Sequence, residues 1–466
     1  MSDTTAASYK PDMQVMTLSE HMPAFADPND PTGFTTPEQV AIFTHEWIHY
    51  LHNVSTIVGM TTICTYANIW NSFRWTFKDD GWSHPDGAED LTVVPAIELQ
   101  FDYLRALRSA GKSVIPRSAE ARLTRATGYK LEREEDLPTH LVDFISLSLE
   151  YRRNDDAEAE QHVALIKTHE ILEYAAFALE EIASIKLGSV PRTPKLIPYL
   201  LVAKLAELVS PNLDKMQILK TAIACLQHPS PPGQLLRILK RVEHARLAGK
   251  DADAEVASAA TELLEMQRDR AEMNLRQTES AFTYAEPMGD SVKHTMASIR
   301  RLLSYRLKNP FFEIDAIGDF KDVKSSVAKL IYAFGGPIFV QRRLGYHDQI
   351  GRDLMYNFFA LDPEIHEIAN GWLWAHAAYR FIGAHIGEDR KIMATAKARP
   401  IACPFYTTCV CTFRETTPDL CTTKPWLSVL SGENTCEFAH AVHITRPPAS
   451  DVPLRTHLAP DATQAD

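Results

Sequence analysis

The segment FTHEWIHYLHNV, residues 43–54, places three histidines along one side of a helix. His45, His49 and His52 follow one another at intervals of four and three residues, which stack side chains on one helical face. Imidazole side chains pack poorly in an apolar core, so we expect water or a metal ion against this face of the helix. The fold must therefore leave a polar site beside this helix.

The helix that carries these histidines is predicted to begin in TTPEQVAIF, residues 35–43. Thr36 suits the N-cap, Pro37 suits the first helical position, and Gln39 can complete a capping box. The histidines then lie in the helix interior, where their relative positions are fixed by the backbone.

HEWIH has the pattern HExxH. One helical turn separates His45 from His49, so both imidazoles can bind one zinc ion while Glu46 reaches a water on that ion. Zinc lowers the pKa of such a water to about 7, and a neighbouring carboxylate can accept its proton. The pattern predicts Zn²⁺ held by His45 and His49, with Glu46 as catalytic base. A solvated helix face that bears histidines is the alternative.

A third ligand is required, because catalytic zinc usually has three protein ligands and one water. His52 lies too far along a straight helix, so we expect it to be a polar neighbour. Glu173 is the best candidate, since it lies among alanines in the predicted helix THEILEYAAFALEE, where a carboxylate is costly unless it meets a cation. A solvated acidic stripe with Glu170, Glu180 and Glu181 is the alternative.

Together these residues resemble the zincin metallopeptidases of the glutamate-ligand type, in which a glutamate from a later helix joins an HExxH helix. More closely, the sequence looks like a group of uncharacterised bacterial HExxH proteins whose third ligand lies in an L-x-E-x-x-A-like segment, which Leu172, Glu173 and Ala176 approximate loosely because Leu172 directly precedes Glu173. The resemblance covers about residues 36–188. It implies a zinc metallopeptidase with the ligands and base named above.

The segment VDFISLSLEYR alternates apolar and polar residues, which predicts a half-buried strand, and QHVALIK is the candidate for its returning partner. The resemblance implies an edge strand that pairs with an extended substrate, and VDFISLSLEYR is the candidate. It also implies a Tyr, His or Arg that stabilises the transition state. The sequence offers four unranked candidates: Tyr346, His347, His376 and Tyr379.

The predicted fold is mainly α with a small β-sheet or hairpin, and combines a zincin-like core with a large helical region. The predicted segments are an extended N-terminal arm at 1–35, the metal-binding core at 36–188, a helical region at 189–400, a Cys-rich segment at 401–444 and a disordered tail at 445–466.

Five of the seven cysteines lie close together in the sequence: Cys403, Cys409, Cys411, Cys421 and Cys436. Their spacing matches no zinc-finger pattern. Such dense thiols can bind a structural zinc or an iron–sulfur cluster, remain as reduced thiols, or form disulfides in an exported protein. The sequence leaves these alternatives open.

A net charge of −12 over 466 residues argues against a general binder of nucleic acid or anionic membranes. The N-terminus does not resemble a secretory signal, and charge interrupts each apolar stretch before membrane-spanning length. We therefore expect a cytoplasmic protein whose partner is a specific protein or peptide substrate.

Two other functions stay open. The long helical region suits a non-catalytic interaction protein whose zinc is structural. A di-iron carboxylate protein is the other alternative, because Glu437 and His440 form a second E-x-x-H pair beside that of Glu46 and His49.

Overall fold

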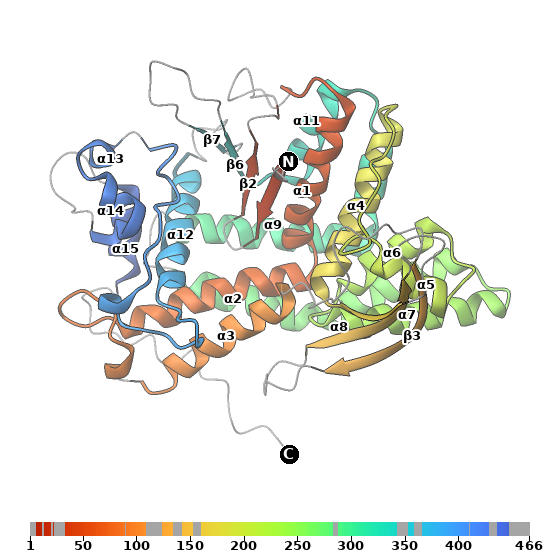
Figure 1. The fold of residues 1–466 in the computed structure, drawn as a ribbon, viewed down its shortest axis with the longest axis horizontal. Helices are drawn as coiled ribbons and strands as arrows, with labels where there is room; N and C mark the ends of the chain where they lie inside the picture. Colours follow the sequence, from red (N-terminus) through yellow and green to blue (C-terminus); the bar gives the residue numbers. More distant parts are fainter. Residues whose placement is uncertain are drawn as a thin grey trace. The chain divides into compact units, whose positions relative to one another are not determined.

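The computed structural model describes residues 6–11, 14–19, 22, 33–88, 90–108, 124–133, 142–151, 160–282, 288–342, 353–357, 366–409, 411–427 and 436–446. Within these residues the chain is mainly helical, with one four-stranded and one three-stranded sheet (Figure 1). The predicted mainly α class is confirmed, with two small sheets in place of a single hairpin.

The chain forms two compact units, each built from three separated stretches. The first comprises Met1–Ile63, Phe101–Arg268 and Ser298–Phe358, and the second comprises Cys64–Gln100, Asp269–Ala297 and Phe359–Asp466. The segment boundaries expected from the sequence stay a prediction beside this division.

The helices account for most of both units. Those of the first unit are α1 (Pro37–Ser55), α4 (Thr168–Lys186), α5 (Leu201–Val209), α6 (Lys215–Cys225), α7 (Pro231–Leu247), α10 (Phe312–Gly318) and α11 (Val323–Phe334). Those of the second are α12 (His366–Ala384), α13 (Phe413–Thr416), α14 (Pro418–Thr423) and α15 (Glu437–Thr445). Residues of α2 (Ile57–Phe73), α3 (Val93–Arg108), α8 (Ala252–Ala281) and α9 (Met288–Lys308) are divided between the units. No helix among the described residues is both long and apolar enough to cross a membrane.

Helix α1 begins as the sequence predicts. The Gln39 amide donates to the Thr36 hydroxyl at 3.4 Å, and the Thr36 amide donates to the Gln39 side-chain oxygen at 3.1 Å, which completes the capping box. Most of the helix after its first turn is buried, and α4 packs along it. The HExxH segment therefore lies inside the first unit.

A buried network of charged groups holds the C-terminal end of α1. Arg306 of α9 donates to the Ser55 carbonyl at 2.7 Å and to the Glu313 carboxylate at 3.0 Å. Nε2 of His52 lies 3.3 Å from the same carboxylate. His52, Arg306 and Glu313 are each at most 1% exposed. The tight turn into α2 follows, where a Cβ at Gly59 would lie 2.2 Å from the His52 carbonyl oxygen.

The four-stranded sheet has the order β1-β2-β6-β7 and includes β1 (Ala7–Lys10), β2 (Val15–Leu18), β6 (Ile338–Gln341) and β7 (Leu354–Asn357). Strand β1 pairs antiparallel with β2, which pairs parallel with β6, and β6 pairs antiparallel with β7. Met16 and Leu18 are fully buried, which anchors β2 in the core. The segment expected as an extended arm thus contains two strands, and β1 lies at the sheet edge beside α1.

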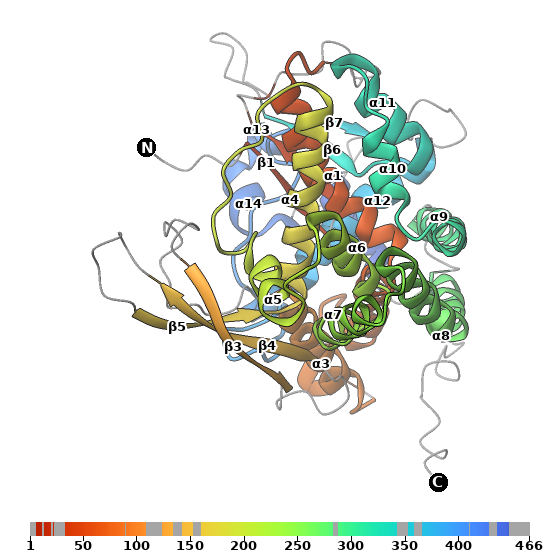
Figure 2. The same ribbon diagram turned by 90° about the vertical axis from the view of Figure 1, so that its right-hand side faces the viewer.

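The second sheet is antiparallel with the order β3-β4-β5, formed by β3 (Thr124–Arg133), β4 (Asp143–Tyr151) and β5 (Glu160–Ile166). Helices α5 and α7 pack against it (Figure 2). Ile145, Leu147 and Leu149 are fully buried, which confirms the predicted half-buried strand and its returning partner. However, β4 is the central strand, so the prediction that VDFISLSLEYR is a substrate-binding edge is wrong: both its edges are already paired.

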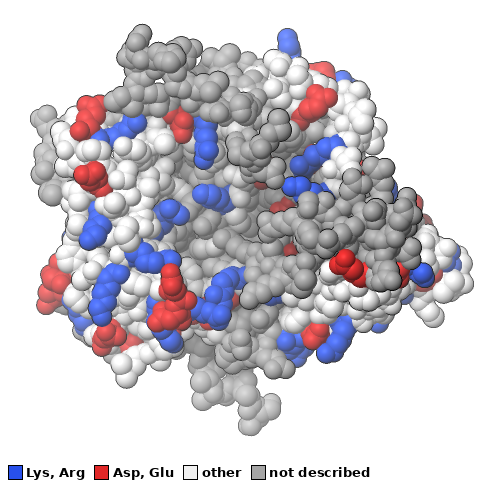
Figure 3. Space-filling model, in the orientation of Figure 1, with Lys and Arg blue, Asp and Glu red and all other residues white. Residues whose placement is uncertain are grey.

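Figure 3 shows one face of the molecule. On this face the basic side chains of the described residues are interspersed with acidic ones.

Candidate metal centre

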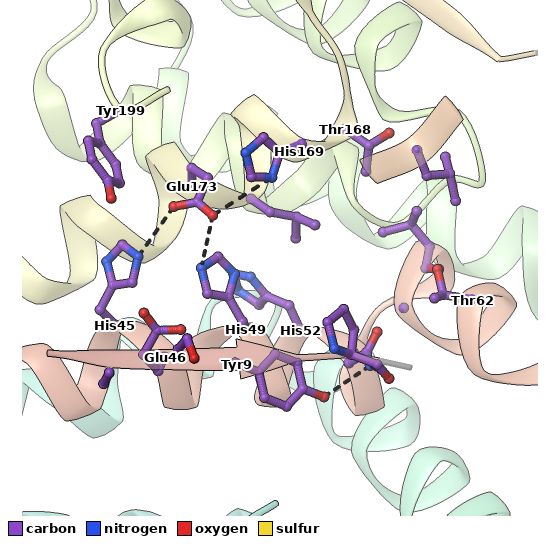
Figure 4. Close-up of a pocket in the computed structure, with 18 residues that line it drawn as sticks. Tyr9, His45, Glu46, His49, His52, Thr62, Thr168, His169, Glu173 and Tyr199 are labelled. Carbon is purple, nitrogen blue, oxygen red and sulfur yellow. Dashed lines mark hydrogen bonds and ion pairs between the residues drawn. The ribbon is translucent and has the colours of Figure 1, made fainter. Parts of the chain in front are cut away.

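His45 and His49 of α1 and Glu173 of α4 converge at one point (Figure 4). Oε2 of Glu173 lies 3.3 Å from Nε2 of His45, and its Oε1 lies 3.5 Å from Nε2 of His49. One donor atom from each of the three residues lies within 4.8 Å of the other two. The structure thus brings together the three residues that the sequence singled out, and within the described ranges no other His, Cys, Asp and Glu residues form such a group.

Two features of α4 place Glu173 against α1. Ala175 and Ala176 are fully buried, so small side chains permit the close approach of the helices. Glu170 is also fully buried, and its carboxylate accepts the Lys167 amide at 2.9 Å as part of the helix cap. Glu170 therefore caps α4, which begins at Thr168 with Lys167 at the N-cap. The alternative of a solvated acidic stripe therefore does not fit Glu170, which is buried and caps the helix.

Glu180, two turns beyond Glu173, holds the other side of His45. Its Oε2 lies 2.9 Å from Nδ1 of His45, and Arg192 donates to the same oxygen at 2.7 Å. Glu180 is 3% exposed. A carboxylate on the second nitrogen of a metal-binding histidine fixes the ring orientation and raises its basicity. The sequence could have identified Glu180 as a second partner of His45, because residues 173 and 180 lie on the same face of the helix.

The charges around His45 call for a cation. Burial lowers the pKa of His45. Contacts with Glu173 and Glu180 and the charge of Glu46 outweigh this effect and raise the pKa to about 9. Burial alone would raise the pKa of Glu173, but His49 and His45 hold it well below its usual range. Carboxylates and imidazoles packed this closely suit a bound divalent ion. Two histidine nitrogens and one carboxylate oxygen are ligands that zinc accepts.

The three residues lie on the wall of a cavity of about 400 Å³, which also contains Glu46. The carboxylate of Glu46 accepts the backbone N–H of Tyr9 from β1, and burial raises its pKa. Glu46 is outside the convergent group but on the same wall (Figure 4). His52 also lines the cavity but contacts Glu313, so it lies outside the group, as expected.

Two residues at the cavity were missed in the sequence. The ring of Tyr199 lies 5.8 Å from that of His45 and 5.3 Å from the Arg192 guanidinium. Nδ1 of His169 lies 3.7 Å from Oε1 of Glu173. Both line the cavity, and both can donate a hydrogen bond to a negative oxygen. Tyr199 lies between helices with no surrounding pattern, so only the fold identifies it.

The earlier candidates for this role are placed differently. His376 and Tyr379 belong to α12 of the second unit and are not among the residues that line the cavity. Tyr346 and His347 lie outside the described residues.

The second E-x-x-H pair, Glu437 and His440, lies on α15. The Trp374 indole N–H donates to Glu437, and the ring of His440 lies 4.1 Å from that of Trp374. Neither residue takes part in a three-residue metal group among the described residues. Nothing in these contacts favours a di-iron site.

The role of Glu180 leads to a first prediction. Glu180→Ala should retain the fold but bind zinc about 10- to 100-fold more weakly, because His45 loses the carboxylate that orients it. Glu181→Ala is the matched control. Glu181 is the next residue on the same helix, but its side chain is more exposed and faces Lys215, at 3.9 Å, rather than His45. Competition with a chromophoric chelator measures both affinities. Equal affinities for the two variants would contradict the positioning role.

The convergent group fits a known pattern, in which an HExxH helix is joined by a glutamate from a later helix, as in zincins. Comparisons with protein-family models, with curated proteins and with solved structures give no match for this chain.

Proposed function

We propose that this protein is a zinc-dependent metallopeptidase that hydrolyses a peptide bond in a specific protein or peptide. One observation carries the proposal: His45, His49 and Glu173 converge on the wall of a cavity that also holds the Glu46 carboxylate. Three ligands with an open side, next to a base that is not a ligand, are the components of a hydrolytic zinc site.

Each residue has a role in this proposal. Zinc would act as a Lewis acid on the substrate carbonyl and lower the pKa of a water. Glu46 accepts a proton and returns it to the leaving amine, and its buried carboxylate is more basic than one in water. Tyr199, and His169 on the other side of Glu173, donate hydrogen bonds to the carbonyl oxygen as it becomes negative.

Strand β1 supports an extended peptide as substrate. The Ser19 amide donates to the Ala6 carbonyl at 2.8 Å, so by antiparallel alternation Ser8 and Lys10 bond to β2. Ala7 and Tyr9 then direct their backbone groups away from β2, and both residues line the cavity. The Tyr9 N–H already bonds to Glu46, so a peptide added along this edge would pair with the backbone of Ala7, next to the metal ligands. Strand β1 therefore takes the role first assigned to VDFISLSLEYR.

The cavity also favours particular side chains near the cleaved bond. Val58, Leu107 and Leu172 line it along with the polar residues. Burial of an apolar substrate side chain against them would contribute about 1.5–3 kcal/mol. We therefore propose a substrate that is extended and apolar near the cleaved bond. The net charge of −12 disfavours nucleic acid and anionic membranes as partners.

The proposal predicts zinc that depends on Glu173. The purified protein should hold about one zinc ion at this site, and Glu173→Ala should lose it because two histidines alone bind zinc weakly. Glu181→Ala should keep its zinc. Metal analysis by mass spectrometry measures both variants. Full zinc content in a His45→Ala, His49→Ala double variant would rule out this site.

Peptide cleavage tests the activity directly. A peptide library from a digested proteome, incubated with the protein, should show new termini by mass spectrometry. A chelator should abolish the cleavage, and added zinc should restore it. Bound zinc without any cleavage of the library or of a captured cellular partner would favour the structural-zinc alternative.

A further inference from the structure

Arg192 lies in the irregular segment between α4 and α5 and binds Glu180, the residue that holds His45. Nη2 of its guanidinium donates to Oε2 of Glu180 at 2.7 Å, and its Nε lies 2.5 Å from Oε1. One guanidinium therefore holds both oxygens of the carboxylate. A bidentate pair of this kind fixes the plane of the carboxylate as well as its position, which a single contact does not.

The two partners differ in their exposure to water. The Glu180 side chain is 4% exposed, whereas that of Arg192 is 47% exposed. A carboxylate buried to this extent is costly unless a positive charge and hydrogen bonds compensate it. Arg192 supplies both, and Oε2 of Glu180 also lies 2.9 Å from Nδ1 of His45. The carboxylate thus lies between an arginine that reaches the surface and a histidine of the candidate metal centre.

The same guanidinium also contacts Tyr199. Its Cζ lies 5.3 Å from the centre of the Tyr199 ring and 5.6 Å from that of Phe177, distances at which a cation is attracted to an aromatic ring. The two rings are 5.4 Å apart, so the three side chains pack as one group. The Tyr199 ring in turn lies 5.8 Å from that of His45 (Figure 4). This packing limits where the Tyr199 hydroxyl can lie relative to the metal ligands.

Both contacts of Arg192 lead to the same metal ligand. Glu173, Phe177 and Glu180 follow one another at intervals of four and three residues, so they lie on one face of α4. A purely structural role for Arg192 would be to attach the segment after α4 to this helix. The arrangement favours a role in the site, because the two groups that Arg192 holds, the Glu180 carboxylate and the Tyr199 ring, each contact His45.

We propose that Arg192 is a positioning residue of the candidate metal centre. Its guanidinium holds the Glu180 carboxylate against His45 and holds the Tyr199 ring beside it. A metal ligand and a hydrogen-bond donor for the transition state therefore keep their positions through one side chain. The part that concerns Tyr199 rests on the proposed function, whereas the part that concerns His45 rests on metal binding alone. Arg192 is not among the residues that line the cavity, so it acts through these neighbours.

Arg192→Gln tests both contacts, because glutamine lacks the charge and the fork of donors. Zinc affinity, measured by competition with a chromophoric chelator, should fall by about 10-fold, the lower end of the effect of losing an outer partner of a metal ligand. At saturating zinc, kcat should fall by about 10-fold with KM unchanged, because a misplaced Tyr199 affects only the transition state. Arg192→Lys keeps the charge without the fork and should recover part of both losses. The control is Lys186→Gln, at an exposed position on α4, which should change neither quantity.

Combined variants separate the two contacts. In a Glu180→Ala background, Arg192→Gln should weaken zinc binding no further, and in a Tyr199→Phe background it should lower kcat by much less than in the wild type. Wild-type zinc affinity and turnover in Arg192→Gln, or a lower thermal unfolding midpoint as its only change, would overturn the proposal. A chain that binds zinc but cleaves no peptide would refute the proposed function, while zinc affinity would still decide the role of Arg192 toward His45. If Arg192→Gln does not fold, Arg192→Lys decides by the same measurements.

Discussion

Glu46→Gln should lower peptide hydrolysis by at least about 100-fold while the protein retains its zinc. Glutamine keeps the size of the side chain and one acceptor oxygen but cannot accept a proton at neutral pH. Glu46 is outside the group formed by His45, His49 and Glu173, so its charge is not needed to hold the metal. The remaining oxygen can still accept the Tyr9 N–H, so β1 should remain in place.

The matched control for this experiment is Glu38→Gln, an exposed position in the first turn of the same helix. It should leave turnover unchanged. Zinc content, peptide cleavage and thermal unfolding of the three proteins separate a lost base from a lost fold. The inactive variant should also retain uncleaved substrate, which gives a way to identify the natural partner. Turnover equal to wild type in Glu46→Gln would refute the catalytic role and favour an interaction protein.

The part of the site that lies on single helices could be predicted from the sequence. His45 and His49 are one turn apart on a helix whose start is specified by Thr36 and Gln39, so local geometry alone brings them together. Glu173 was identifiable because a carboxylate among alanines needs a cation. Glu180 follows it by two turns, and the same helical spacing could have identified its contact with His45.

The rest of the site depends on contacts between segments far apart in the sequence. Tyr199 reaches the cavity from an irregular segment, and no local pattern marks it. Alternation correctly predicted the strand at Ile145, but not the two neighbouring strands that close its edges. Likewise, the density of cysteines indicated a possible metal site, but among the described residues no three of their sulfurs lie within 4.8 Å of one another. Such distances are set by tertiary packing.

Arg306→Met should destabilise the protein by about 3–5 kcal/mol, since it leaves a buried carboxylate without its main partner. The Arg306 side chain is 1% exposed and bonds to Glu313 and to the Ser55 carbonyl. Methionine fills a similar volume but removes the guanidinium from the Glu313 carboxylate, which then faces the His52 imidazole. It also leaves the last carbonyls of α1 without this donor, at the end of the helix that carries His45 and His49. Urea unfolding measures the effect as a lower midpoint.

A second substitution tests whether the unpaired charge is the cause. Arg306→Met combined with Glu313→Leu removes both ions, and it should recover much of the lost stability, because apolar replacements of a buried ion pair are often neutral. Lys308→Met, at an exposed position on the same helix, should change stability by less than about 1 kcal/mol. If the double variant is no more stable than Arg306→Met alone, the loss comes from the bond to Ser55 and not from the Glu313 charge. A single variant as stable as wild type would mean that the network does not hold α1, and the position of the metal ligands would then depend on the packing of α1 against α4.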